Sequence, residues 1–147
     1  MNKEELSKRI TSNDLKNLLS LYKEFDDCKQ QYNDIDYYLV HSVNYSNQKS
    51  SSKKHDVLEN EVIKIQERKD ELMIQMLNLS NTILETRFNA LKILFKIPSK
   101  AQQETLYLRY FINKSVKEIM KIKGYSDKSH IYANLSAGCK SFDAVQL

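Results

Sequence analysis

Lysine, serine, histidine and tyrosine side chains recur between Leu106 and Phe142, and their chemistry suits contact with a nucleic acid. Ammonium groups neutralise phosphates, whereas hydroxyl, imidazole and phenol groups form hydrogen bonds to sugars and base edges. The candidate contact residues are Lys117, Lys121, Lys123, Lys128, Ser129, His130, Tyr132, Ala133, Ser136 and Lys140. We expect the first three lysines at backbone phosphates, and Lys128 with the residues that follow it in the major groove.

The charge distribution favours the same segment. The chain has a formal net charge of +4. The residues up to Pro98 are neutral, with 15 basic and 15 acidic side chains, whereas Ser99 to Leu147 holds eight basic and four acidic ones. A local basic excess attracts phosphates and gains affinity from counterion release. A solvated basic surface without a partner is the alternative interpretation.

The elements that must position these residues are two short helices joined by a turn. Ser115 and Glu118 have the spacing of a capping box, which predicts a helix start, and Val116, Ile119 and Ile122 would form its buried stripe. Gly124 lies where the chain must turn, and Ser126 or Asp127 would cap the next helix. In that second helix the inward positions are Ile131, Leu135, Cys139 and Phe142. Helix, glycine turn and helix is the layout of a helix-turn-helix.

The segment LYLRYFINKSVKEIMKIKGYSDKSHIY is similar to the region of sigma-70-type factors that contacts the promoter −35 element. The matching positions are Leu106, Arg109, Tyr110, Ser115, Glu118, Ile119, Gly124 and Ser126. Two positions depart from that pattern. Met120 replaces a small residue, and the second helix has Ser129 and Ala133 where Arg or Gln is usual, which predicts poor direct base contact.

The layout of the whole chain resembles phage late transcription regulators of the ArpU and RinA type. The resemblance rests on an N-terminal helical region, a Ser-rich stretch, a long charged helix, a single proline and the segment above. It implies a DNA-binding regulator, with activation of late genes the expected role, in the cytoplasm of a bacterial host. The implied partners are double-stranded promoter DNA and host RNA polymerase.

Composition predicts an all-α fold. Only two glycines and one proline occur in 147 residues, too few for the many turns of a β-sandwich or barrel. We expect a helical oligomerisation or partner-binding region at residues 1–97, with a flexible loop at about 44–55, and a DNA-binding module at 98–147. Asn13 to about Tyr32 has helical periodicity, and Ile35 to Val43 either continues that helix or forms a second one.

A heptad pattern marks the longest predicted helix, Asp56 to Lys96. Of the twelve a and d positions from Leu58 to Ile97, ten are apolar. Such a seam must pack on the N-terminal helix of the same chain, on a second copy, or on both. We therefore expect a homodimer or higher oligomer as one outcome. The predicted seam residues are Leu58, Val62, Ile65, Leu72, Met76, Leu79 and Ile83.

The start of the C-terminal module is predicted at the single proline. Pro98 should end the long helix, because the residue before a proline is disfavoured in the α region. Ser99 should cap a new helix, with Gln102 as its capping-box partner.

Several function classes are not expected. The separation of Cys28 and Cys139 fits no metal-binding motif. We expect both to be small buried residues of a protein in a reducing compartment. We expect no membrane span, no signal peptide, no metal and no cofactor. No nucleophilic triad or phosphate-binding glycine loop occurs, so we expect no enzyme. The alternative function is a helical interaction or adaptor protein that acts through its coiled coil, with the C-terminal module binding protein.

Overall fold

The computed structural model describes the backbone of residues 9–46 and 52–146, and side chains within 9–41 and 59–146. Every regular element in these ranges is a helix, which confirms the all-α fold. The elements are α2 (Ser12–Ser46), α3 (Ser52–Leu94), α4 (Lys100–Leu106), the π-helical turn η1 (Tyr107–Phe111), α5 (Val116–Lys123) and α6 (Ser129–Ala144). No described helix is both long enough and apolar enough to cross a membrane.

The described chain divides into two compact units. One, here called the arm, comprises residues 22–46 and 52–81. The other, here called the head, comprises residues 9–21 and 82–146. This division differs from the predicted boundary at residue 97. The reason is that the start of α2 and the end of α3 carry buried leucines, Leu15, Leu18 and Leu94, that belong to the head.

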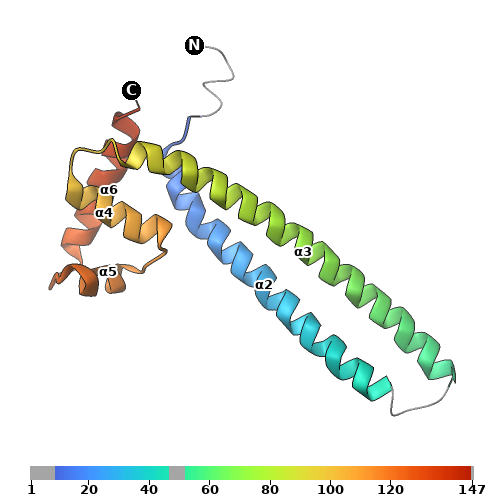
Figure 1. Cartoon of the computed structure of the whole chain (residues 1–147). Coiled ribbons are helices and arrows are strands. Elements are labelled where there is room, and N and C mark those ends of the chain that lie inside the picture. Colours follow the sequence, from blue (N-terminus) through green and yellow to red (C-terminus); the bar gives the residue numbers. More distant parts are fainter. Residues whose placement is uncertain (1–8, 47–51, 147) are drawn as a thin grey trace. The chain divides into compact units, whose positions relative to one another are not determined.

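The arm consists of the parts of α2 and α3 that lie outside the head, and these two parts run antiparallel to each other (Figure 1). Cys28 of α2 packs in one cluster with Leu72 and Met76 of α3, and Leu79 lies against it. The α2 side chains around this cluster are Phe25, Tyr32 and Ile35. A heptad seam that meets a second helix of the same chain is thereby removed from water.

An ion pair flanks the arm seam. The Nζ atom of Lys69, the lysine in the heptad core, lies 2.6 Å from the Asp36 carboxylate and 5.0 Å from the centre of the Tyr32 ring. The hydrogen bond to Asp36 raises the pKa of Lys69. A lysine at an a position is thus accommodated by partners that α2 supplies.

The described helices extend into both ends of the predicted loop at about 44–55. α2 runs without interruption through the predicted Ile35–Val43 segment to Ser46, and α3 begins at Ser52. Residues 47–51 lie outside the described ranges. The flanking Ser, Asn and Lys residues join the helices because extending an existing helix is easier than starting one, and propensity differences are small.

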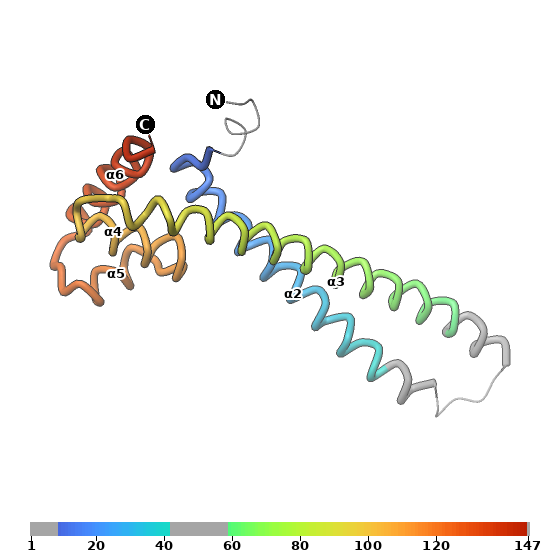
Figure 2. Tube along the Cα trace, turned by 45° about the horizontal axis from the view of Figure 1, so that its top comes forward, coloured from blue at the N-terminus to red at the C-terminus, as the bar shows by residue number. Residues whose placement is uncertain are grey.

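The head has its own core, to which every one of its helices contributes. The fully buried side chains include Leu15 and Leu18 from α2, Leu94 from α3, Leu106 from α4, Ile119 from α5 and Phe142 from α6. α6 lies against α4 (Figure 2). At this contact a Cβ atom on Gly138 would lie only 3.0 Å from Cγ of Leu106, so the glycine permits the close approach of the two helices.

A carboxylate of α6 holds the start of α2 within the head. The backbone N–H and the hydroxyl of Ser12 each donate to one oxygen of the Asp143 carboxylate, both at 2.8 Å. Ser12 is buried, so these hydrogen bonds satisfy polar groups that have lost water. The first turn of α2 is thereby tied to the last turn of α6.

The predicted helix start after Pro98 is correct, but its capping box is only half formed. The Ser99 hydroxyl accepts from the backbone N–H of Gln102, as expected for an N-cap. The Gln102 side chain does not return to Ser99. Its amide oxygen instead accepts a hydrogen bond from the Ser141 hydroxyl at 2.8 Å, because α6 packs on this side of α4.

Candidate nucleic-acid interface

The entry into α5 is fixed by one hydrogen bond and by one residue in the left-handed conformation. Arg109 donates to the carbonyl oxygen of Lys114 at 3.0 Å, across a turn in which Asn113 has φ of 60°. Asparagine tolerates this left-handed conformation better than most residues. Arg109, one of the sigma-like positions, therefore shapes the turn that leads into α5.

The capping box at the start of α5 is confirmed. The hydroxyl of Ser115 accepts from the N–H of Glu118 at 3.2 Å, and the Glu118 carboxylate accepts from the N–H of Ser115 at 3.3 Å. The hydrogen bond from the Ser115 backbone lowers the pKa of Glu118. The predicted buried stripe is correct for Ile119 but wrong for Ile122, which is exposed because its face of α5 borders a cavity.

The turn between α5 and α6 has the predicted glycine geometry. Gly124 ends α5 with φ of 71° and ψ of 24°, a left-handed conformation that an L side chain rarely adopts. The predicted cap of the next helix, Ser126 or Asp127, is wrong: the N-cap of α6 is Lys128, which forms no side-chain capping hydrogen bond. The Asp127 carboxylate, one residue earlier, accepts from the N–H of Ser129 at 3.0 Å. This hydrogen bond lowers the pKa of Asp127.

α6 presents one side to the core and the other to solvent. Ile131, Cys139 and Phe142 are buried and Leu135 is half-buried, as predicted. The opposite face is exposed throughout its length and consists of Ser129, Ala133, Ser136 and Lys140. His130 and Tyr132 are exposed at its edges, and the His130 ring lies 5.6 Å from the ring of Tyr125. Small side chains therefore leave the backbone of this face accessible.

Four of the five lysines predicted to contact DNA are free to contact a polyanion. Lys117, Lys121, Lys128 and Lys140 are exposed and form no ion pair with any described residue. Lys123 differs from the prediction. It is half-buried and forms an ion pair with Glu104 of α4, because the last turn of α5 directs it towards α4 rather than outward. Lys123 is therefore removed from the candidate interface.

Comparisons of the chain with protein-family models, curated proteins and solved structures found no match. The assignment of a function therefore depends on the geometry of the site. That geometry combines an exposed helix face of small side chains with ammonium groups on the same helix and on the preceding one. Such a surface can contact phosphates through charge and approach a groove closely, but it has few side chains that form bidentate bonds to bases.

Two buried polar side chains in the core of the head, Tyr110 and Cys139, serve packing rather than chemistry. Burial raises the pKa of Tyr110 to about 12, with a further contribution from the neighbouring Cys139. Burial also raises the pKa of the Cys139 thiol. Both cysteines of the chain are buried and free, as predicted. A thiol that stays protonated is a poor nucleophile, so Cys139 acts here as a packing residue.

The structure divides the predicted partner seam between the two units. Within the arm, Leu72 and Met76 are buried and Val62, Ile65 and Leu79 are half-buried, whereas Ile83 is buried in the head. The side chain of Leu58 lies outside the described residues. The middle of the seam is thus covered by α2 of the same chain, one of the three arrangements that the heptad pattern left open.

Sequence reasoning missed an exposed apolar face formed by the end of α3 and the turn that follows it. Leu84, Phe88 and Phe95 are exposed, and the last of these borders a cavity of about 590 Å³ in the head. The spacing of these three residues, four and then seven, could have predicted this face from the sequence. The stronger heptad pattern on the opposite side of α3 drew the interpretation instead.

Proposed function

We propose that the head binds double-stranded DNA through α5 and α6 as a helix-turn-helix, and that the protein regulates transcription. The single observation that supports this most is the exposed face of α6, where small side chains and Lys140 lie opposite the face that packs on the core. A recognition helix needs such a face, because side chains and backbone must approach the base edges of the major groove.

The exposed lysines should supply the electrostatic part of the binding free energy. Lys117 and Lys121 are one helical turn apart on α5, and Lys128 precedes the first turn of α6. Each phosphate that they neutralise releases counterions, so affinity falls as the salt concentration rises. The small side chains of α6 contribute less, and we infer that site selection depends on DNA shape or on a second bound molecule.

The biological setting follows from the resemblance of the sequence. A sigma-like module joined to a helical hairpin suits a phage-encoded activator of late genes that works beside host RNA polymerase in the bacterial cytoplasm. This setting is part of the proposal, and the binding chemistry above does not depend on it.

Lys117→Gln/Lys121→Gln tests the electrostatic contribution. We expect wild-type protein to bind labelled AT-rich duplex DNA with an affinity that falls linearly on a logarithmic salt scale. The double variant should bind every duplex more weakly, and its salt slope should be smaller by about two, because each phosphate contact contributes about 0.9. Fluorescence anisotropy across a salt series measures both quantities.

A matched control removes two lysines from the arm. Lys29 and Lys64 are exposed, so Lys29→Gln/Lys64→Gln changes the net charge equally without altering the proposed interface. This control should keep the wild-type salt slope. Equal slopes for all three proteins, or no binding by the wild type at low salt, would contradict the proposal.

A helical interaction or adaptor protein is the second candidate. The exposed apolar residues of the head, among them Phe88 and Phe95, favour it, because large exposed apolar patches mark sites of protein association. Under this alternative the wild-type protein binds no duplex DNA, and substitution of α5 lysines has no effect on its association with a protein partner.

A further inference from the structure

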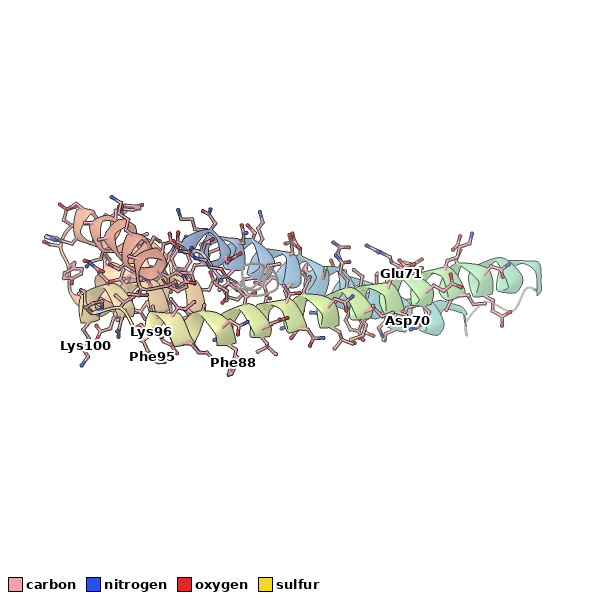
Figure 3. All side chains as sticks on the ribbon, turned by 90° about the horizontal axis from the view of Figure 1, so that it is seen from above. Asp70, Glu71, Phe88, Phe95, Lys96 and Lys100 are labelled. Carbon is pink, nitrogen blue, oxygen red and sulfur yellow. The ribbon has the colours of Figure 1, made fainter. Side chains whose placement is uncertain are left out.

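The end of α3 and the turn that follows it carry a second apolar stripe, distinct from the heptad seam. Leu84, Phe88, Leu91 and Phe95 follow one another at intervals of four, three and four residues. Leu84, Phe88 and Phe95 are 58%, 63% and 72% exposed. Phe88 of α3 and Phe95, the residue directly after this helix, project on the same side of the ribbon (Figure 3). We call these four residues the outer stripe.

The outer stripe continues into the cavity of the head. Leu91 and Phe95 line this cavity together with Tyr107 of η1 and Ile122 of α5. Tyr107 and Ile122 are themselves exposed. A partner on the outer stripe would therefore cover apolar surface from η1 and α5 as well as from α3, which matters because a stable interface needs roughly 800 Å² per partner.

We propose that a second copy of this chain packs on the outer stripe, with the two α3 helices antiparallel. Alternating steps of three and four residues are the spacing that a partner helix recognises. The same stripe on a second copy supplies that spacing, and a two-fold axis brings identical surfaces together. Phe88 then lies against Leu91 of the second copy, and Leu84 against Phe95 of the second copy.

The charges beside the outer stripe decide the direction of the helices. Glu85 and Lys92 are exposed and seven residues apart, so they follow the same flank of the stripe. In an antiparallel pair this flank meets itself, and each Glu85 faces Lys92 of the other copy. In a parallel pair Lys92 would instead lie on the flank of Arg87 of the other copy, and like charges would approach each other. Arg87 is half-buried, and its guanidinium lies 6.0 Å from the centre of the Phe111 ring of its own chain. Charge complementarity thus favours the antiparallel arrangement.

Phe88→Glu tests the interface. Sedimentation equilibrium of the wild-type chain without DNA should give a dimer at micromolar concentration. Phe88→Glu should raise the dimer dissociation constant at least tenfold, because a carboxylate would be buried against Leu91 of the second copy. Ile63→Glu is the matched control: Ile63 is 54% exposed on α3, outside the proposed overlap, and this variant should dimerise as the wild type does.

Charge exchange tests the direction. Glu85→Lys and Lys92→Glu should each weaken the dimer several-fold, and the double variant should restore it. Tightening by Lys92→Glu alone would overturn the antiparallel arrangement. A monomeric wild type at tens of micromolar, or equal dissociation constants for Phe88→Glu and the wild type, would overturn the interface itself. Circular dichroism at the same concentrations establishes that each variant is folded, and because no DNA is present the result is independent of the proposed function.

Discussion

At the residue scale, a few side chains and two glycines define the geometry of the head. Gly124 supplies a left-handed turn, and Gly138 supplies space for Leu106. Asp143 and Asp127 each accept hydrogen bonds from backbone N–H groups at the start of a helix. These residues act through backbone conformation and hydrogen bonding, so their effects should appear in stability as well as in binding.

Gly124→Ala should lower the free energy of unfolding by about 1 kcal/mol, because an L residue in the left-handed region is strained. No atom lies within 4 Å of the Cβ that alanine would add, so the cost is conformational rather than steric. Gly124→Asn should cost less, since asparagine tolerates this region. Chemical denaturation of the three proteins checks the order, and equal stabilities would show that the turn can change its conformation without cost.

At the element scale, each short helix of the head is delimited by a local hydrogen bond. The Ser115–Glu118 capping box begins α5, Gly124 ends it, and Asp127 satisfies the first turn of α6. α5 is only eight residues long, and helices of this length are not stable alone in water. Its position therefore depends both on the capping box and on the burial of Ile119.

The capping box predicts a loss of stability in acid. The pKa of Glu118 is lowered from 4.5 in the folded chain, first by the hydrogen bond from the Ser115 backbone. A lowered folded pKa contributes stability that is complete above pH 4.5 and is lost as the pH falls through the folded value. Glu118→Gln should therefore lose less stability than the wild type on acidification. Denaturation at a series of pH values measures this, and identical pH profiles would argue against the assignment.

At the scale of the whole molecule, each unit has a core of its own. The heptad seam is covered within the arm by α2, and the head is closed by residues from both ends of the described chain, as the Ser12–Asp143 contact shows. The heptad seam is therefore not free to serve a partner at its middle. That is why the outer stripe, rather than the predicted seam, is our proposed surface for a second copy.

Leu72→Ala tests the closure of the seam within the chain. Leu72 is fully buried, so its truncation should lower the free energy of unfolding by about 2–5 kcal/mol. Leu77→Ala is the matched control, because Leu77 lies one turn along the same helix and is 57% exposed. This control should change stability by no more than about 0.5 kcal/mol. Similar losses for both variants would mean that Leu77 is also covered in solution, by a second chain.

The sequence by itself determined the local features of this protein. The capping box at Ser115, the turn at Gly124 and the alternation of buried and exposed residues along α6 depend on neighbours within a few positions, so spacing alone predicts them. Tertiary structure decided which polar groups meet across elements. Lys123 is paired with Glu104, and Gln102 with Ser141, because α4 packs against its neighbours. The spacing of residues along the chain does not predict such contacts between separate helices. For the same reason the heptad pattern predicted a seam but could not say which helix covers it.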